Sequence, residues 1–210
     1  MKILFLSDTH EAHSSLAVLP KADIIIHGGD ISYCGKPEAI KDFLNWFSNL
    51  ENYRYKIFIA GNHDFYFEGK QQHLIQQSLP ENTFYLCDNG VTIEGIKIWG
   101  SPITPRFFNW AFNRSRGKEI LKHWNRIPKD TNILVTHGPA YGILDCTKER
   151  IHAGCEDLLA VINKIKPQYH LSGHIHEGYG ILKKDHTTFI NGSVSNDRYE
   201  PVNQPILFEY

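Results

Sequence analysis

The chain has 210 residues, 41% of them hydrophobic and 21% charged, which suits one compact domain spanning residues 1–210. Its 22 basic and 23 acidic residues leave a formal charge of −1 without long blocks of either sign, so we expect no long nucleic acid as a partner. No apolar run is long enough to span a bilayer and the first residues leave no room for a signal peptide, so we expect a cytoplasmic protein without a membrane anchor.

Five short apolar runs have strand character, and each is followed at once by side chains that can bind a metal or a phosphate. In α/β proteins, ligands bind at the carboxyl ends of the strands, so these side chains are expected to share one rim. In chain order, residues 3–6 precede Asp8 and His10, residues 24–26 precede Asp30, residues 57–60 precede Asn62, His63 and Asp64, residues 133–135 precede His137, and residues 169–171 precede His174 and His176.

Helical periodicity is clearest over residues 37–50, where apolar residues recur on one face and Pro37 suits the first turn. Shorter helices are expected over 71–78, 118–127 and 156–166, and a further one over 11–19. Residues 84–86 and 206–208 are expected to form strands. Alternating residues on either side of Glu94-Gly95 predict a hairpin that belongs to a second, more antiparallel sheet, and 180–190 predict another.

Residues 100–116 have no regular periodicity but concentrate aromatic and guanidinium groups. This segment contains Arg106, Phe107, Phe108, Trp110 and Arg114. It is either a loop packed against the core by its aromatic residues, or a lid that stacks a flat base and offers an arginine to a phosphate. Both interpretations stay open at this stage.

The side chains on the rim predict a metal centre. Mixed carboxylate, imidazole and amide ligands suit Mn, Fe, Zn or Ni rather than Ca, and the absence of thiolates among them argues against a structural zinc site. Seven or eight ligands point to two divalent ions, bridged by a carboxylate. The candidate groups are Asp8, His10, Asp30, Asn62, His63, His137, His174 and His176.

These residues carry a family resemblance that covers nearly the whole chain. Five ordered blocks match those of the calcineurin-like metallophosphoesterases: Asp8-x-His10, Gly29-Asp30, Gly61-Asn62-His63-Asp64, His137 and Gly173-His174-x-His176. Finer features, among them the segments 136–139 (THGP) and 173–180 (GHIHEGYG), resemble the branch with the MPPED-type cyclic-nucleotide phosphodiesterases. The resemblance implies a four-layer α-β-β-α sandwich of two mixed sheets flanked by helices, with the metal site at the carboxyl ends of the strands.

The resemblance also implies roles for individual residues. One metal would take Asp8, His10, Asp30 and His176, and the other Asp30, Asn62, His137 and His174, with Asp30 as the bridge. His63 resembles the family's catalytic histidine that is not a ligand, and Asp64 resembles the partner that orients it.

The predicted chemistry is hydrolysis of a phosphate ester. A hydroxide that bridges two dications, with Mn as the first candidate, would attack the phosphorus in line, and protonated His63 would stabilise the transition state or protonate the leaving oxygen. We expect a small phosphodiester, with cyclic nucleotides (3′,5′ or 2′,3′) first. The expected substrate contacts are Asn62, His63, Arg106, Phe107, Trp110 and Arg198.

Two alternatives remain open. The same metal centre could serve a phosphomonoesterase or a nucleotide pyrophosphatase, which would need positive charge for extra phosphates. A metal-loaded binding scaffold with little activity is the other alternative, although no surface indicates an obligate protein partner. Among the remaining histidines, we expect His73, His123 and His186 on the surface and His27, His152 and His170 in packing or supporting positions, and His13 could line the substrate pocket.

Overall fold

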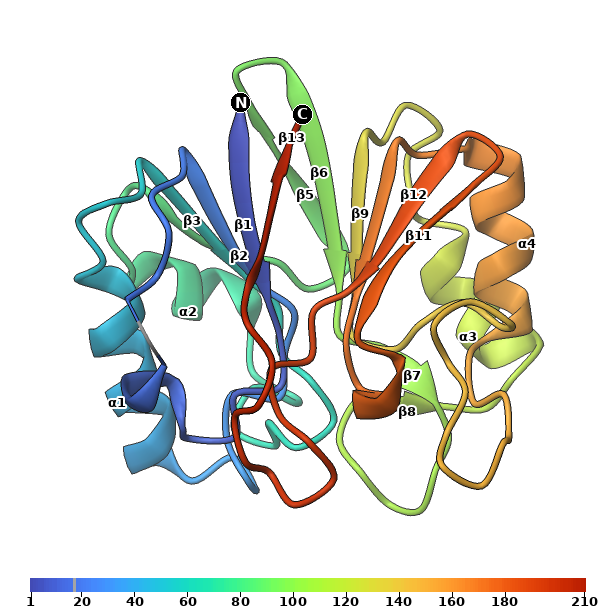
Figure 1. The fold of residues 1–210 in the computed structure, drawn as a ribbon, viewed down its shortest axis with the longest axis horizontal. Coiled ribbons are helices and arrows are strands. Elements are labelled where there is room, and N and C mark those ends of the chain that lie inside the picture. The colour runs from blue at the N-terminus through green and yellow to red at the C-terminus, as the bar shows by residue number, and fades with distance from the viewer. Residues whose placement is uncertain (17) are drawn as a thin grey trace.

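The computed structural model describes residues 1–16 and 18–210, and it has four layers (Figure 1). Two β-sheets pack face to face in the middle, and helices cover the outer face of each sheet. The predicted α-β-β-α sandwich of two mixed sheets is therefore confirmed. The sheets hold their strands in the order β13-β1-β2-β3-β4 and β11-β12-β10-β9-β6-β5.

The first sheet is parallel except for the last strand of the chain, which pairs antiparallel with the first. Its strands are β1 (Lys2–Leu6), β2 (Ile24–His27), β3 (Tyr55–Phe58), β4 (Thr83–Tyr85) and β13 (Ile206–Glu209).

The second sheet contains both predicted hairpins as its edges, so it has two antiparallel pairs where the first sheet has one. Between the hairpins, β12-β10-β9-β6 run parallel. Its strands are β5 (Asn89–Ile93), β6 (Ile96–Ser101), β9 (Ile133–Thr136), β10 (Tyr169–Ser172), β11 (Gly180–Lys184) and β12 (Thr187–Asn191). A separate pair, β7 (Thr104–Pro105) and β8 (Asn113–Arg114), was not predicted.

Among the described residues, four helices occupy the outer layers, as predicted: α1 (Pro37–Ser48), α2 (Gln72–Gln77), α3 (Lys118–Trp124) and α4 (Glu156–Ile165). The helix expected over 11–19 is wrong for the described residues, since only a 3-10 turn, η1 (His13–Ser15), forms there, and residue 17 lies outside them. A second 3-10 turn, η2 (His176–Gly178), follows β10. None of the helices in the described part of the chain has the length and apolar character needed to cross a membrane.

Strand residues alternate between two hydrophobic clusters, because successive side chains point to opposite faces of a sheet. In β1, Ile3 and Phe5 belong to the cluster between the sheets, whereas Leu4 and Leu6 belong to the cluster that includes the buried helix residues. Both faces of the central strands are thus buried, which accounts for their continuous apolar sequences.

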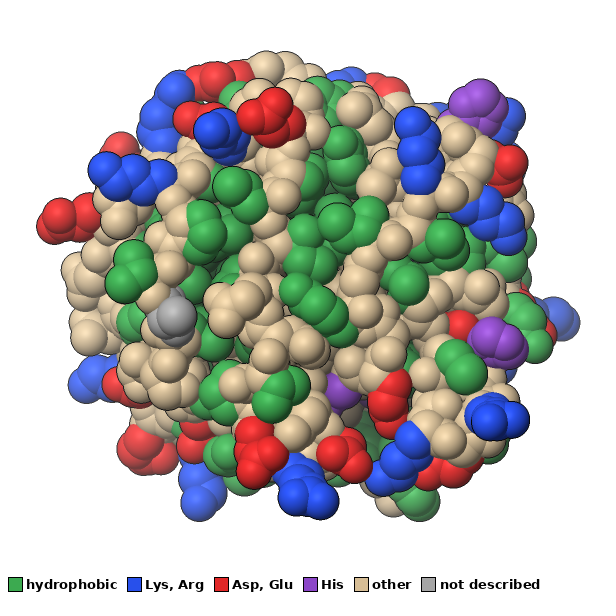
Figure 2. All heavy atoms as spheres, in the orientation of Figure 1, with side chains coloured by type: hydrophobic (Ala, Val, Ile, Leu, Met, Phe, Trp, Pro, Cys, Tyr) green, Lys and Arg blue, Asp and Glu red, His purple; other side chains and the backbone are tan. Residues whose placement is uncertain are grey.

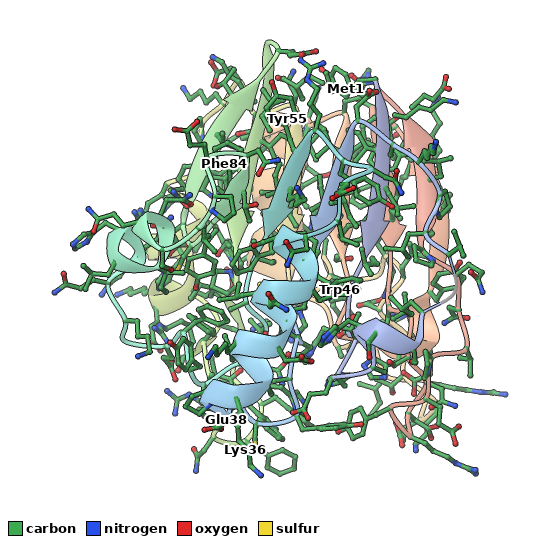
Figure 3. All side chains as sticks on the ribbon, turned by 90° about the vertical axis from the view of Figure 1, so that its left-hand side faces the viewer. Met1, Lys36, Glu38, Trp46, Tyr55 and Phe84 are labelled. Carbon is green, nitrogen blue, oxygen red and sulfur yellow. The ribbon has the colours of Figure 1, made fainter. Side chains whose placement is uncertain are left out.

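The parallel strands bring their carboxyl ends to one edge of the molecule. In Figure 1 the N-terminus lies at the top, so β1 runs downward and its ligand motif lies near the lower edge. Figure 3 shows α1 across the outer face of the first sheet, with Lys36 and Glu38 at this lower end and Tyr55 and Phe84 toward the opposite end. The fold therefore gathers the predicted ligand loops from both sheets at a single edge.

Candidate metal centre and substrate pocket

The ligand side chains are delivered by sharp turns directly after the strands. Asp8, His10, Asp30 and His174 all have positive φ, at 57°, 41°, 53° and 66°. Non-glycine residues rarely adopt this backbone region, and such strained residues concentrate at functional sites. The turns are fixed by backbone hydrogen bonds, because Asp8 N donates to Gly29 O at 2.9 Å and His10 N donates to Asp30 O at 3.0 Å.

Three groups of histidine and aspartate side chains are close enough to hold metal ions. Within each group, one ligand atom from each residue lies within 4.8 Å of the others. The groups are Asp8 with His10 and His176, Asp30 with His137 and His174, and His10 with Asp30 and His63. Six of the seven predicted ligands therefore meet, and Asp30 belongs to two groups, as a bridging carboxylate would.

His10 has the clearest need for a bound cation. Its side chain is fully buried, yet neither ring nitrogen has a hydrogen-bond partner among the described residues. A buried polar group without a partner is costly, so an imidazole in this state is suited to donating a lone pair to a metal. Burial lowers its pKa to about 4, against the opposing charges of Asp30 and Asp8, so the ring is neutral, the form that coordinates metal.

Asp30 lies at the centre of the site. Its Oδ1 accepts a hydrogen bond from His63 N at 2.9 Å, and its Oδ2 lies 3.2 Å from His137 Nε2 and 3.9 Å from His10 Nε2. Burial alone would raise the pKa of Asp30, but His137 and the other imidazoles hold it well below its usual range. The carboxylate is therefore ionised and surrounded by nitrogen ligands.

Backbone carbonyls orient two of the imidazoles. His137 Nδ1–H donates to Gly28 O at 2.9 Å, so its Nε2 faces Asp30 and lies 2.9 Å from Asn62 Oδ1. This contact brings the seventh predicted ligand, Asn62, to the same site. Buried His137 has its pKa raised to about 9, because Asp30 and Asp8 outweigh the opposing effect of burial. The carboxylates thus favour a positive charge at this place.

His176 is held in the same way, since its Nδ1–H donates to Asn196 O at 2.8 Å and its Nε2 lies 3.6 Å from Asp8 Oδ1. Burial lowers its pKa, but the contact with Asp8 outweighs that effect and raises it to about 9. For His174 the balance is reversed, because burial together with the charge of His137 outweighs the opposing charges of Asp30 and Asp8 and lowers its pKa to about 4.

Two glycines allow the carboxylates to approach the backbone. A Cβ at Gly61 would lie 2.2 Å from Asp30 Oδ1, and one at Gly173 would lie 2.1 Å from Asp8 Oδ2. No side chain can be accommodated at such distances without moving the carboxylate. The glycines of both motifs are thus needed for the site itself.

Among the described residues, Asp64 makes no hydrogen bond with His63, and its role as the orienting partner stays a prediction. His63 Nδ1 instead contacts the Tyr33 carbonyl at 2.7 Å. The buried carboxylate of Asp64 accepts hydrogen bonds from Ile31 N, Gly61 N and both the backbone N–H and the hydroxyl of Ser32, at 2.8–3.1 Å. Its connection to His63 runs through the loop that presents Tyr33. Burial and the charge of Asp30 raise the pKa of Asp64 to about 6, against the effect of these donors.

A pocket of about 240 Å³ opens beside the ligand groups. Figure 2 shows histidine atoms between acidic and hydrophobic side chains near the lower middle of this face. The pocket is lined by Asp30, Asn62, His63, Phe107, Trp110, His174, His176, Glu177, Asp197 and Tyr199.

Four of the six predicted substrate contacts line this pocket, and the two arginines do not. Arg106 and Arg198 are exposed, and their backbone N–H groups are bonded to Arg114 O and Asn196 Oδ1. Their neighbourhood therefore gives no support to a role in binding the substrate phosphate.

The segment 100–116 contributes both to the core and to the pocket wall, and the lid that offers an arginine to a phosphate stays a prediction. Ala111 and Phe112 are buried in the core, whereas Phe107 is 57% exposed and lines the pocket. Trp110 stacks on the His63 ring with 4.2 Å between centroids. The ends of the segment pack against the core and its tip forms one wall of the pocket.

The prediction that His123 lies on the surface is wrong, and His13, which the sequence left open, does not line the pocket. His123 is half-buried, not on the surface, because its Nδ1 pairs with Asp88 Oδ2 at 2.5 Å. His13 faces α1 instead of the substrate pocket, with Nε2 3.0 Å from Asp42 Oδ2 and its ring against Trp46. His73 and His186 are exposed, as predicted.

Sequence reasoning missed several groups at the pocket. Tyr199 is 37% exposed, and its ring centroid lies 4.5 Å from that of His10. It belongs to a strap, residues 195–201, that passes over the ligand loops, and the concentration of turn residues there was the only signal. Glu177 and Asp197 also line the pocket. The role of the Tyr33 carbonyl could not be read from the sequence, because every residue has a backbone carbonyl.

Comparison with known proteins agrees with this geometry. A family model described as calcineurin-like phosphoesterase matches residues 1–178. Metallophosphoesterase domain-containing protein 1 of Homo sapiens is 38% identical over 231 residues, which cover 99% of this chain and 70% of that protein. UPF0046 protein T07D4.2 of Caenorhabditis elegans is 34% identical, covering 96% of this chain and 58% of its own. The structure of phosphopantetheinyl hydrolase (PptH) from Mycobacterium tuberculosis shares the fold, with a TM-score of 0.62 at 12% identity over 98% of this chain and 95% of that one.

Proposed function

The chain belongs to the calcineurin-like phosphoesterase family, and on that premise we propose that it is a dinuclear-metal phosphodiesterase acting on small diesters, with cyclic nucleotides as the substrate class. One observation carries the choice of a small diester. The pocket beside the ligand groups has aromatic walls, and no lysine or arginine is among the described residues that line it. A substrate with further phosphate groups would find no cation there to bind them.

The residues present fit two divalent metal ions. The unpartnered nitrogens of buried His10, the raised pKa values of His137 and His176, and the two glycines that make room for carboxylates all favour cations at this position. Nitrogen and carboxylate donors in this mixture suit Mn first, with Fe, Zn or Ni as alternatives. One ion would be held by Asp8, His10, Asp30 and His176, and the other by Asp30, Asn62, His137 and His174.

When bound, the ions would supply a nucleophile at neutral pH by lowering the pKa of water and would neutralise the phosphate oxygens. In this proposal, His63 handles the proton of the leaving group. Its Nδ1–H donates to the Tyr33 carbonyl, which leaves Nε2 at the pocket, 4.0 Å from Asp30 Oδ2. A proton on Nε2 can pass to the leaving oxygen, and Trp110 keeps the ring in this plane by stacking on it.

The pocket walls suit the organic part of a nucleotide. Phe107 and Trp110 on one side and Tyr199 on the other offer flat surfaces on which a base can stack. A volume of about 240 Å³ leaves room for one small organic group next to the reacting phosphate.

The experiment measures turnover of the Mn²⁺-reconstituted protein on two diesters, bis-p-nitrophenyl phosphate and cyclic AMP, and on two other esters, p-nitrophenyl phosphate and ATP. We expect the diesters to be preferred and His63→Ala to lower kcat by at least about 100-fold with both metals still bound. Preference for p-nitrophenyl phosphate or ATP would instead indicate a phosphomonoesterase or a pyrophosphatase. If the protein carried two metals but hydrolysed none of the four substrates, the proposal would be contradicted and a metal-loaded binding scaffold would be favoured.

A further inference from the structure

The pocket wall beyond the metal ligands combines aromatic side chains with two carboxylates. Glu177 follows His176 directly in η2, and Asp197 lies on the strap two residues before Tyr199. Both carboxylates line the same pocket as Phe107 and Trp110. The pocket is a ligand site on independent grounds, because it adjoins the buried histidine and aspartate groups described above.

Lys148 fixes the two carboxylates from outside the pocket. Its backbone N–H donates to Glu177 Oε1 at 3.2 Å, and its ammonium group pairs with Asp197 Oδ2 at 3.2 Å. Lys148 itself lines an adjoining hollow of about 250 Å³, which shares Glu177, Asp197 and His176 with the substrate pocket. The two acids therefore form the partition between these hollows.

One oxygen of each carboxylate remains free to bind a ligand. Within the described part of the chain, neither Glu177 Oε2 nor Asp197 Oδ1 takes part in a hydrogen bond. An ionised carboxylate only accepts hydrogen bonds, so these oxygens attract N–H donors and repel carbonyl or phosphate oxygens. Both carboxylates line the same pocket as Trp110, so a ligand in this pocket borders the aromatic ring and the two acids.

We propose that Glu177 and Asp197 select substrates whose organic arm carries an exocyclic amino group or an ammonium group. This inference rests on the phosphodiesterase function proposed above and narrows its substrate class. For a cyclic nucleotide, the donor is the exocyclic amino group of adenine or cytosine, stacked between the aromatic walls. The ammonium group of an amino-alcohol ester offers the same chemistry, and the test separates the two sources.

Matched ligands isolate the donor. Cyclic CMP and cyclic UMP differ where cytosine has an amino group and uracil an oxygen, and cyclic AMP and cyclic IMP differ in the same way. Glycerophosphoethanolamine and glycerophosphoglycerol form the pair that tests an ammonium group. Binding is measured by titration calorimetry on Mn²⁺-loaded His63→Ala protein, so that turnover does not interfere, and turnover is measured separately on the wild-type protein.

We expect the amino-bearing nucleotide of each pair to bind at least about tenfold more tightly, and the combined Glu177→Gln and Asp197→Asn substitutions to reduce this preference to about twofold or less. Turnover of bis-p-nitrophenyl phosphate, which has no N–H donor, should stay within about twofold of wild type in Glu81→Gln protein. The control is Glu81→Gln. Glu81 is exposed and lies just before β4, at the end of the first sheet opposite the pocket. Its substitution should leave every binding preference unchanged.

The inference would be overturned if the two members of every pair, including glycerophosphoethanolamine and glycerophosphoglycerol, bound equally well. It would also be overturned if a preference survived in the double variant. A preference confined to the ethanolamine ester would support the role of the acids and assign the donor to an amino alcohol. Failure of the wild-type protein to hydrolyse any diester would contradict the proposed function, while the binding preferences would still decide the role of the two acids.

Discussion

Replacing Asp64 by Asn tests how the structure positions His63. The Asp64 carboxylate is fully buried and accepts four hydrogen bonds, two at Oδ1 from Ser32 and two at Oδ2 from Ile31 N and Gly61 N. An amide at this position keeps one acceptor oxygen and turns the other into a donor. If the NH₂ group of the new amide faces Ser32, the Ser32 hydroxyl can accept a hydrogen bond from it, and only the Ser32 backbone N–H loses its partner. In the opposite orientation, the backbone N–H groups of Ile31 and Gly61 both lose their partner.

An unpaired buried donor costs about 1–3 kcal/mol, so we expect the amide to face Ser32 and the free energy of unfolding to fall by about 1–3 kcal/mol. The measurement is urea unfolding of the metal-free protein, followed by intrinsic fluorescence. The control is Asp42→Asn, the same chemical change at a carboxylate that is 71% exposed and bonded to His13, which should cost less than about 0.5 kcal/mol.

The same substitution should lower activity, because the loop fixed by Asp64 presents the Tyr33 carbonyl that holds His63 Nδ1. We expect kcat on bis-p-nitrophenyl phosphate to fall by at least about tenfold with both metals bound. A stability within about 0.5 kcal/mol of wild type would refute the hydrogen-bonding argument. A clear loss of stability with unchanged kcat would refute the connection to His63.

Three further predictions concern packing, pH and stability. Gly173→Ala should lower the metal content measured by elemental analysis below two ions per chain, because the new Cβ would lie 2.1 Å from Asp8 Oδ2; two ions in the variant would contradict this. Burial lowers the pKa of His170 to about 3 in the folded protein. As the pH falls, this histidine is therefore protonated in the unfolded chain before it is protonated in the folded one. The free energy of unfolding is consequently highest above about pH 6.5 and decreases as the pH falls toward 3. His170→Asn should therefore flatten the decline of urea midpoints between pH 7 and pH 4, and unchanged slopes would count against it. Asp88→Ala should lower the free energy of unfolding by about 2–4 kcal/mol, because the buried carboxylate pairs with His123, while activity persists; unchanged chemical denaturation would show that the pair is unimportant.

The metal ligands could be predicted from the sequence because each lies within a few residues of a strand end. The apolar run fixes the strand, and the parallel arrangement brings the carboxyl ends together. This local relation placed Asp8, Asp30 and His137 at one site although they come from both sheets. The four-layer arrangement came from the family resemblance, since periodicity alone indicates elements and not how sheets stack.

The supporting contacts could not be predicted, because many of them use backbone atoms. The carbonyls of Gly28, Tyr33 and Asn196 orient His137, His63 and His176, and a carbonyl carries no residue identity that a sequence pattern could reveal. The contact between His63 Nδ1 and the Tyr33 carbonyl could not be predicted for the same reason. The family resemblance implied that Asp64 orients His63, whereas in the folded chain a loop carbonyl contacts this nitrogen.

The strap at residues 195–201 escaped prediction because its course is set by the ligand loops it crosses. Ser195 Oγ donates to Asp8 O at 2.6 Å, and Asn196 O accepts from His176 Nδ1 at 2.8 Å. Both contacts involve residues of the predicted metal centre, so the strap is attached to the groups that would hold the ions. Tyr199 and Asp197 are consequently held by a strap that is bonded to the predicted ligand loops, so the proposed substrate selection and metal binding would depend on the same contacts.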